Sequence, residues 1–254
     1  MRNLSGKVAW ITGAGSGIGA GTALAYAGAD MQLVLSGRRE RELQLVAEQI
    51  AALGGSARIA VLDVSDAQAV QAVVAGIQAR EGRLDVVINS AGLNVLKRNW
   101  KHLSLADWNQ VIRIDLDGAF YCCHAVLPMM RQQRDGLIIN VSSWAGRHVS
   151  AMTGPAYSAA KFGLNAMTES INIEEGLHGI RATAVCPGEV STPILDKRPV
   201  PVSAADRAQM VQPDDCGELM LFLARMPAHV CINDLTISPT WNRMYVPQAQ
   251  GIPS

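Results

Sequence analysis

The sequence predicts a single α/β domain built around one parallel sheet. Short apolar runs alternate with stretches of helical periodicity along the whole chain. The first run ends in a glycine-rich turn at residues 12–19, and Tyr157 and Lys161 are spaced i, i+4 in a later helical stretch. Strict alternation of strand and helix implies parallel strands joined by right-handed crossovers.

The apolar runs predicted as strands are Val8–Thr12, Met31–Ser36, Arg58–Asp63, Val86–Asn89, Leu137–Ser142, Arg181–Cys186 and Ile232–Ile237. The helical stretches between them are 18–28, 39–53, 66–80, 107–132, 156–177 and 214–225. Ligands bind at the carboxyl ends of parallel strands, so the residues at those ends form the predicted site.

Composition describes one globular domain, residues 1–254, with 49% hydrophobic residues. Basic and acidic residues number 22 each, which gives no sign of a nucleic-acid or anionic-membrane surface. Five cysteines at irregular spacing argue against a disulfide framework and favour the reducing cytoplasm. We expect no metal site, because no His/Cys pattern occurs, and no signal peptide or apolar span of the ~20 residues that a membrane requires.

The first strand leads into the turn Thr12-Gly-Ala-Gly-Ser-Gly-Ile-Gly19. Gly13, Gly17 and Gly19 let the backbone turn tightly and approach a pyrophosphate, and the following helix offers free N–H groups at its N-terminus. Ser16 and Ile18 lie in the same turn. Alone the spacing is a weak signal, but between an apolar strand and an amphipathic helix it indicates a dinucleotide cofactor.

The second strand ends in Leu35-Ser36-Gly37-Arg38-Arg39. A carboxylate at this position favours the ribose hydroxyls of NAD, whereas arginine binds a 2′-phosphate bidentately. We therefore predict NADP(H), held by Arg38 and Arg39 with a hydrogen bond from Ser36. The alternative is that both arginines only begin a solvated helix with residues 40–42.

Tyr157 and Lys161 fall on one face of a helix. A phenol has an ordinary pKa of ~10, and a nearby ammonium favours the phenolate and lowers that value. A serine at a neighbouring strand end, such as Ser143, would hold the oxygen of a carbonyl or alcohol. These groups can move a proton while a cofactor moves a hydride.

Tyr157-Ser-Ala-Ala-Lys161, the glycine turn, Asn89-Ser90-Ala91-Gly92 and Pro187-Gly188 occur together and in order. With these motifs the chain resembles the short-chain dehydrogenase/reductase family in its compact one-domain, NADP-preferring form, over roughly residues 4–240. The resemblance implies a Rossmann-like, doubly wound domain. Its parallel sheet would have seven strands in the order 3-2-1-4-5-6-7, with helices on both faces.

By the same resemblance, Tyr157 is the general acid/base, Lys161 lowers its pKa and holds the nicotinamide ribose, and Ser143 orients the substrate oxygen. Ser142 is the competing serine; Ser143 is preferred because it aligns with the family's Ser-x-x-Gly. One departure is Asp115, which replaces the family's usual asparagine in the central helix. In the family the backbone carbonyl at this position holds a water near the lysine, and an aspartate would add negative charge there. The plain structural interpretation is an ordinary helix residue.

The resemblance also implies further cofactor contacts. Asp63 and Val64 would bind the adenine side, with capping of the helix near Asp66 as the alternative role for Asp63. The remaining contacts would be Asn89, Ala91, Gly92, Pro187, Gly188, Val190 and Thr192, the last four beside nicotinamide.

A substrate loop is expected at 192–213, as a mobile lid, and a short tail at 240–254. The pocket would lie under that loop, beside Trp144, Arg147 and residues 93–100, where Arg147, Lys197 and Arg198 are either carboxylate anchors or solvated surface residues. The segment 227–239 resembles family members that reduce aldehydes or oxidise 3-hydroxy acids, including serine-type substrates.

Helices 107–132 and 156–177 carry extra apolar residues: Leu116, Phe120, Val126, Phe162, Leu164 and Met167. In the family these helices form a dimer interface within a homotetramer. Burial in the monomer core is the alternative.

The sequence thus predicts an NADP(H)-dependent oxidoreductase that interconverts an alcohol and a carbonyl on a small substrate. Alternatives are a 3-hydroxy acid (serine-type) dehydrogenase of the same family, a non-catalytic NADP-binding scaffold or sensor, and a lyase or epimerase. Substrate identity, stereochemistry, direction and the use of NADH stay open.

Overall fold

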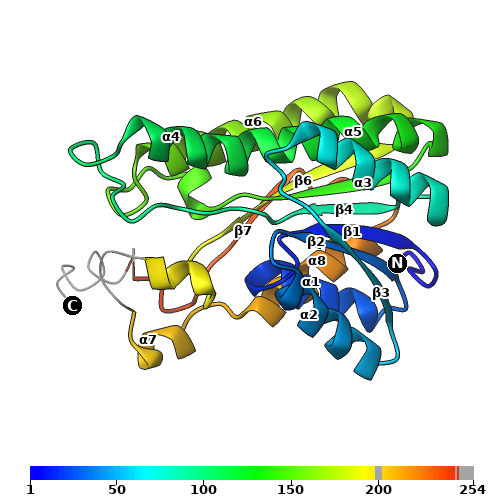
Figure 1. Ribbon diagram of the computed structural model, residues 1–254, viewed down its shortest axis with the longest axis horizontal. Coiled ribbons are helices and arrows are strands. Elements are labelled where there is room, and N and C mark those ends of the chain that lie inside the picture. The colour runs from blue at the N-terminus through cyan, green and yellow to red at the C-terminus, as the bar shows by residue number, and fades with distance from the viewer. Residues whose placement is uncertain (198–201, 244, 246–254) are drawn as a thin grey trace.

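The computed structural model describes residues 1–197, 202–243 and 245 (Figure 1). One sheet holds seven strands in the order β3-β2-β1-β4-β5-β6-β7, and every neighbouring pair is parallel. The strands are β1 (Val8–Thr12), β2 (Gln32–Gly37), β3 (Ser56–Val61), β4 (Val86–Asn89), β5 (Gly136–Val141), β6 (Ile180–Pro187) and β7 (Asp234–Ile237). The predicted fold class and strand order are confirmed.

Helices cover both faces of the sheet (Figure 1). On one face lie α3 (Ala67–Arg80), α4 (Leu105–Ile112), α5 (Gly118–Gln133) and α6 (Pro155–Glu175). On the other face lie α1 (Gly17–Ala27), α2 (Glu40–Ala52) and α8 (Pro213–Arg225), while the short α7 (Ala204–Ala208) stands apart near the β6 end. Each face contributes a hydrophobic core against the buried central strands, so the strand ends are the part of the sheet left for a ligand.

The third strand differs from the prediction of Arg58–Asp63. It spans Ser56–Val61, because β3 pairs residue by residue with β2 and that partner ends at Gly37, opposite Val61. Asp63 therefore follows the strand instead of ending it, and its side chain is available at the loop that leads into α3.

The helix predicted at 107–132 begins earlier and is interrupted. Ser104 caps α4, where its hydroxyl accepts a hydrogen bond from the Asp107 N–H at 3.0 Å. Residues Arg113–Asp117 then form a π-helical turn before α5 begins at Gly118. Such turns are rare and often occur at functional sites, and this one contains Asp115.

Two glycines bring α1 and α8 into close contact. A Cβ at Gly21 would overlap the carbonyl oxygen of Pro213, and a Cβ at Gly217 would lie 2.5 Å from the carbonyl oxygen of Gly21. Because backbone atoms contact backbone atoms here, no side-chain rotation could make room for an added methyl group. The crossing holds the glycine turn, at the start of α1, against the base of α8.

Gly217→Ala should therefore destabilise the protein by about 1–3 kcal/mol, because the added methyl overpacks the crossing. Gly76→Ala is the matched control, since a Cβ there meets nothing within 4 Å and alanine favours the helix by about 0.5–1 kcal/mol. Chemical denaturation of both variants would measure the difference. Equal stability of the two would contradict the close contact.

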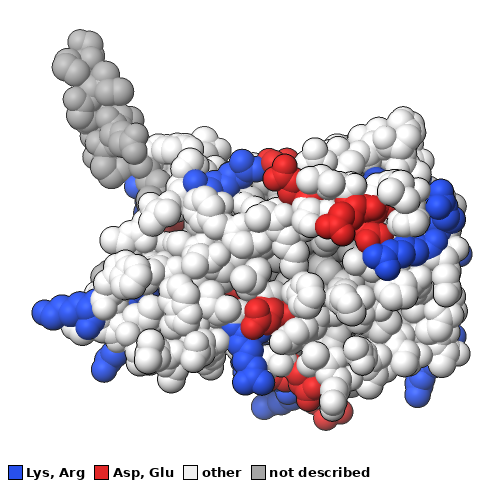
Figure 2. All heavy atoms as spheres, turned by 90° about the horizontal axis from the view of Figure 1, so that it is seen from above, with Lys and Arg blue, Asp and Glu red and all other residues white. Residues whose placement is uncertain are grey.

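Charged side chains are unevenly spread. Figure 2 looks onto the helices at the top of Figure 1, and much of the middle of that face lacks Lys, Arg, Asp and Glu. All five cysteines are free thiols, and Cys122 and Cys123 are buried on α5. Among the described helices, none combines the length and apolar character that crossing a membrane requires.

Candidate active-site cleft

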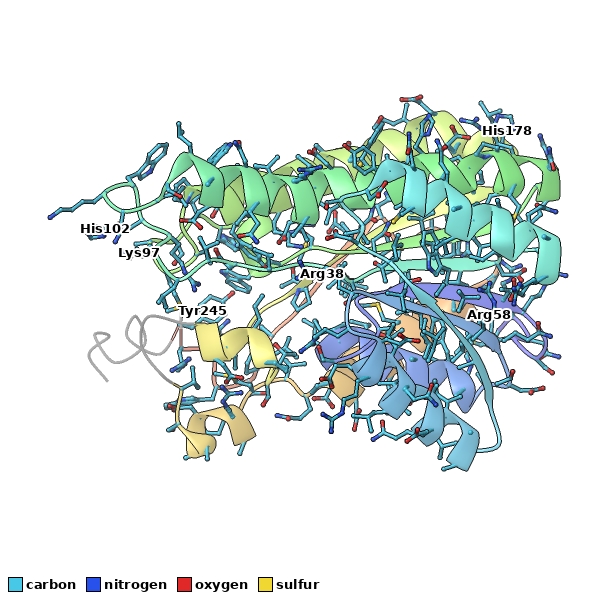
Figure 3. The ribbon with its side chains drawn as sticks, viewed as in Figure 1. Arg38, Arg58, Lys97, His102, His178 and Tyr245 are labelled. Carbon is cyan, nitrogen blue, oxygen red and sulfur yellow. The ribbon has the colours of Figure 1, made fainter. Side chains whose placement is uncertain are left out.

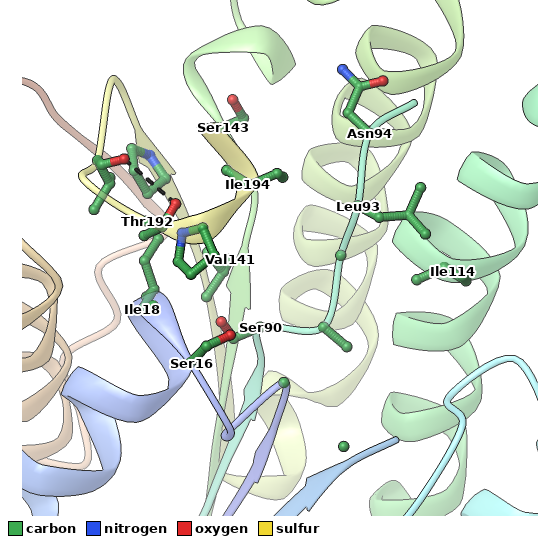
Figure 4. A pocket seen from close by; sticks show the side chains of 18 of the residues that line it. Ser16, Ile18, Ser90, Leu93, Asn94, Ile114, Val141, Ser143, Thr192 and Ile194 are labelled. Atoms are coloured by element: carbon green, nitrogen blue, oxygen red, sulfur yellow. Dashed lines mark hydrogen bonds between the residues drawn. The ribbon is translucent and has the colours of Figure 1, made fainter. Parts of the chain in front are cut away.

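A cleft of about 520 Å³ opens at the carboxyl ends of the central strands. Ser16 and Ser90 lie toward one end of it, and Ser143 and Asn94 toward the other (Figure 4). The predicted site residues that line it are Gly13, Ser16, Gly17, Ile18, Arg38, Arg39, Asp63, Val64, Ala91, Gly92, Ser143, Tyr157, Lys161, Pro187, Gly188, Val190 and Thr192. Gly19, Ser36, Asn89 and Asp115 lie behind its wall.

The glycine turn is held at the ends of β1 and β4. Thr12, which the sequence analysis did not assign, accepts hydrogen bonds from the Ser90 and Ala91 N–H groups at 3.2 and 3.3 Å. A Cβ at Gly13 would lie 2.7 Å from the Ser90 carbonyl oxygen, and its φ of +66° favours glycine. Gly19 faces the Gly13 backbone, where a Cβ would overlap the carbonyl oxygen. The glycine turn thus presents backbone atoms to the cleft, and the N-terminus of α1 points into it.

Two arginines stand at the end of β2. Arg39 donates to the Ser16 hydroxyl at 3.3 Å, and Arg38 lies 4.0 Å from the Asp63 carboxylate (Figure 3). Although burial opposes it, hydrogen bonds from Ser65 and the charge of Arg38 hold the pKa of Asp63 below its ordinary value. Asp66, not Asp63, caps α3. The arginines and Asp63 thus face the cleft together, which the solvated-helix alternative does not require.

Two predicted cofactor contacts point elsewhere. The Ser36 hydroxyl is fully buried and accepts a hydrogen bond from the indole N–H of Trp10 at 2.9 Å. The Asn89 amide donates to Asn140 at 2.8 Å and to the Cys123 sulfur at 3.3 Å. Alternating strand side chains direct both groups into the core, so their side chains do not bind a ligand in the cleft.

Tyr157 and Lys161 extend from the first turns of α6. The Lys161 ammonium donates to the Val141 carbonyl at 3.0 Å and lies 5.5 Å from the centre of the Tyr157 ring. The Ser143 side chain lies close enough to the phenol to lower its pKa, whereas the Ser142 hydroxyl donates to the Lys161 backbone carbonyl at 3.2 Å. Because Ser142 is used by the backbone of α6, the geometry favours Ser143 as the serine that faces a substrate.

Asp115 stands behind the lysine and is buried, 1% exposed. One carboxylate oxygen accepts from the Leu93 N–H at 2.8 Å, and the other lies 3.6 Å from the Lys161 ammonium. Burial raises the pKa of Asp115 to about 6, against the opposing charge of Lys161. It is thus no ordinary helix residue: its side chain faces Lys161, whereas the resemblance assigned the role to the backbone carbonyl at this position.

The Tyr157 phenol differs from expectation in its acidity. Burial raises its pKa above the ordinary value and outweighs the lowering by Lys161. Asp115 raises the value further, while Ser143 and Arg98 lower it. Lys161 lowers the pKa of Tyr157, as predicted, but the net shift is upward. The phenol therefore keeps its proton at neutral pH and can donate it to a substrate.

The segment after β6 covers the cleft. Val190 forms a bridge to Val211, and the Ser191 N–H donates to the Val211 carbonyl at 2.9 Å, so both ends of the substrate loop meet. A 3-10 turn, Pro193–Lys197, and α7 lie between them; residues 198–201 are outside the described chain. A Cβ at Gly17 would lie 3.0 Å from the Thr192 methyl group, so the loop contacts the glycine turn.

Of the three residues considered as carboxylate anchors, Arg147 is the one whose side chain the structure describes, and it does not line this cleft. Arg147 forms an ion pair with Asp234 in a separate surface cavity beside α6. Arg198 and the side chain of Lys197 lie outside the description. The cleft is instead lined by Arg98, a residue that sequence reasoning passed over within the loop 93–100. Between Lys97 and Asn99, nothing in the local sequence distinguishes Arg98 from a solvated loop residue.

The C-terminal segment adds a contact that the sequence did not predict. Arg243 binds Glu189, just after Pro187-Gly188, through two hydrogen bonds of 2.8 and 2.7 Å. Tyr245 packs edge-on against Trp144, with 5.4 Å between ring centres. Glu189, unassigned from the sequence, is thus an anchor for the end of the chain.

The sequence profile of the short chain dehydrogenase family matches residues 7–200. An uncharacterized oxidoreductase of Staphylococcus aureus is 33% identical over 239 residues, 94% of this chain and 100% of the relative. One from Staphylococcus saprophyticus is 32% identical over 240 residues, again 94% and 100%.

Solved structures agree with this match. A metagenomic short-chain oxidoreductase in complex with NADP superposes with a TM-score of 0.82 at 31% identity, over 95% of this chain and 100% of that one. An alcohol dehydrogenase from the archaeon Thermococcus sibiricus, complexed with 5-hydroxy-NADP, gives a TM-score of 0.84 at 27% identity, over 93% and 98%.

Proposed function

The chain belongs to the short-chain dehydrogenase family, and from that premise we propose that it is an NADP(H)-dependent oxidoreductase. It interconverts an alcohol and a carbonyl group on a small substrate. The observation that carries this proposal is the meeting of Ser143, Tyr157 and Lys161 in one cleft with the glycine turn. A protein that only binds a nucleotide does not need a phenol, an ammonium and a serine at one point.

The residues of the cleft fit a dinucleotide. A side chain at Gly13 would collide with the Ser90 backbone, so glycine keeps this turn free of side-chain atoms. The backbone N–H groups at the start of α1 are then open to a pyrophosphate. Arg38 and Arg39 would hold a 2′-phosphate, and Asp63 with Val64 the adenine. Pro187, Gly188, Val190 and Thr192 would orient the nicotinamide. Both solved relatives above were determined with an NADP species, which supports the phosphate assignment.

In the proposed reaction, NADPH supplies the hydride when bound. Ser143 donates a hydrogen bond to the substrate carbonyl oxygen and orients it. Tyr157 delivers the proton to that oxygen during reduction and accepts it during oxidation. Lys161 stabilises the phenolate that remains, and Asp115 holds the lysine by its charge.

Replacing Arg38 and Arg39 together by Gln should raise KM for NADPH about 10–100-fold, because charge-assisted hydrogen bonds contribute about 1.5–3 kcal/mol. KM for NADH, which lacks the phosphate, should change little. Arg41→Gln is the control, as Arg41 is exposed on α2 and absent from the cleft wall. Initial rates with both cofactors on a panel of ketones, aldehydes and oxo acids provide the measurement.

The same substrate panel distinguishes the proposed reductase from the scaffold and epimerase alternatives. Consumption of NADPH that the double variant weakens selectively supports the reductase. A wild-type preference for NADH would show that the arginines belong to the surface of α2. Tight NADPH binding without consumption of cofactor by any substrate would favour the scaffold or the epimerase.

We also propose a homotetramer with an interface through α5 and α6. Phe120 on α5 is 49% exposed, and on α6 Phe162 is 42% and Ile173 74% exposed. Val126 and Leu164, in contrast, belong to the monomer core. The five free thiols support a reducing compartment, and we propose the cytoplasm.

A further inference from the structure

The helix α6 carries Tyr157 in its first turn. Gly154 holds the cap position of that turn and has no side chain that could accept hydrogen bonds from the free N–H groups, and Pro155 follows it. Helix ends fray, because the N–H groups of the first turn lack partners within the helix. The position of the Tyr157 phenol therefore depends on contacts from outside α6.

The loop between β4 and α4 supplies two such contacts. The Asn94 amide donates to the carbonyl of Thr153, four residues before Tyr157, at 2.9 Å. Further along, the backbone of the same loop is pressed against the helix cap. A Cβ at Gly154 would overlap the Arg98 carbonyl oxygen, and Gly154 has a φ of +75°. One side chain and one backbone contact thus tie the start of α6 to this loop.

Thr153 is in turn bonded to the helix itself. Its hydroxyl lies 3.1 Å from the hydroxyl of Ser158, which is buried and adjacent to Tyr157 in the chain. The same Thr153 hydroxyl donates to the Ser150 carbonyl at 2.9 Å, within the turn that precedes α6. Because Thr153 makes these contacts, a hydrogen bond that fixes Thr153 also fixes the first turn of α6.

The residues just before Asn94 contact the cofactor end of the cleft. The Ala91 N–H donates to the Thr12 hydroxyl at 3.3 Å, and the Leu93 N–H donates to the Asp115 carboxylate at 2.8 Å. Thr12 adjoins the glycine turn, and Asp115 faces the lysine. A short segment that ends at Asn94 therefore holds the proposed cofactor site and the phenol in a fixed relation.

Both polar atoms of the Asn94 side chain bind the protein itself. Asn94 lines the end of the cleft away from Ser16 and is 6% exposed (Figure 4). Its side-chain oxygen accepts from the Val95 N–H at 2.8 Å, and its nitrogen donates to Thr153. With these bonds made, Asn94 acts through the position of another group and not by contact with a substrate.

We propose that Asn94 is a positioning residue for the reaction, which through Thr153 holds the Tyr157 phenol where it meets the substrate oxygen. This inference rests on the proposed function. Reacting groups must lie about 3–3.5 Å apart, and a misplacement of ~1 Å can cost about 10²-fold in rate. One hydrogen bond at the start of α6 therefore matters more for the rate than for the fold.

Asn94→Asp tests this at almost equal side-chain volume. The carboxylate still accepts from the Val95 N–H, but it sets an oxygen against the Thr153 carbonyl. We expect kcat for carbonyl reduction to fall about 10–100-fold, while the KM for NADPH changes little. Asn94→Gln keeps the donor on a longer side chain and should recover part of the rate. Asn109→Asp is the control, because Asn109 is exposed on α4 and absent from the cleft wall; it should keep wild-type kcat.

A count of cofactor sites separates a displaced phenol from a loss of folded enzyme. Fluorescence titration with NADPH measures the number of binding sites per chain. Asn94→Asp should show the wild-type number of sites, with the lowered kcat at each of them. A number of sites that falls in proportion to the rate would mean partial unfolding and would overturn the positioning role.

Hydrogen–deuterium exchange measures the anchoring without turnover. The amides of residues 153–161 should exchange faster in Asn94→Asp than in the wild type and in Asn109→Asp, while those of α5 stay unchanged. If this difference appears but the wild type reduces no carbonyl compound, the anchoring stands and the reductase proposal fails. If carbonyl compounds are reduced and Asn94→Asp keeps either the wild-type kcat or the wild-type exchange, the reductase stands and the role of Asn94 is refuted.

Discussion

Tyr157→Phe should lower kcat for carbonyl reduction by roughly 10²–10⁴-fold, the usual contribution of a positioned general acid. Phenylalanine fills the same space and retains the packing of Tyr157 against the core of α3 to α6. Only the hydroxyl is lost, and with it the group whose pKa Ser143 and Lys161 lower. Steady-state rates with saturating NADPH measure the effect, and the KM for NADPH should change little.

Tyr121→Phe provides the control, because Tyr121 lies half-buried on α5 against the same core and outside the cleft. It should keep wild-type kcat. A Tyr157→Phe enzyme with more than a tenth of the wild-type rate would mean that another group delivers the proton.

Because the pKa of Tyr157 is raised, the rates of reduction and of oxidation should depend on pH in different ways. As a phenol at neutral pH, it is ready to donate a proton, so reduction needs no prior ionisation. Oxidation of the alcohol needs the phenolate, and its rate should therefore rise with pH until the phenol ionises. Tyr157→Phe should abolish that rise.

Asp115→Asn should gain stability relative to the wild type as the pH rises from about 4 to 7. The pKa of Asp115 rises from 3.8 to about 6 on folding. Between these values the folded state binds more protons than the unfolded one, so wild-type stability falls as pH rises through the window and is constant above it. The pH-dependent loss is about 3 kcal/mol, at ~1.4 kcal/mol per pKa unit. The asparagine variant does not titrate and should lack it.

Thermal unfolding of both proteins at pH 4 and pH 7 measures this change. The difference in Tm should shift by about 5–10 °C in favour of the variant, since 1 kcal/mol moves Tm by about 2–4 °C at this chain length. Asp117→Asn, in the same π-helical turn, should follow the wild type at both pH values. A difference that is the same at both pH values would refute the buried, titrating carboxylate.

Much of the fold could be predicted because it depends on local patterns. Alternation of apolar runs and helical stretches defines parallel strands, and i, i+4 spacing puts Tyr157 and Lys161 on one side of α6. The direction of a single side chain could not be predicted in this way. Ser36 was expected to face the cofactor, but its hydroxyl, one residue before the end of β2, faces Trp10. Arg147, for which a carboxylate anchor and a surface residue were both left open, forms an ion pair with Asp234.

Arg98 and Asp115 show why the other side chains of the site could be placed only from the three-dimensional structure. Arg98 enters the cleft because its loop is pressed against Gly154, far along the chain, and no pattern around residue 98 contains that contact. Asp115 was placed near Lys161 by resemblance. The π-helical turn that points its carboxylate at the ammonium has no signature in hydrophobic periodicity.

The ion pair of Arg243 with Glu189, and the edge-on contact of Tyr245 with Trp144, tie a late segment of the chain to the neighbourhood of the cleft. The first contact holds the segment after β6, and the second reaches the residue next to Ser143. Neither Arg243 nor Tyr245 lines the cleft itself. Substitutions at these two positions would therefore change the pocket at second hand, by releasing Glu189 or Trp144 from these contacts, without removing any group that meets the ligand.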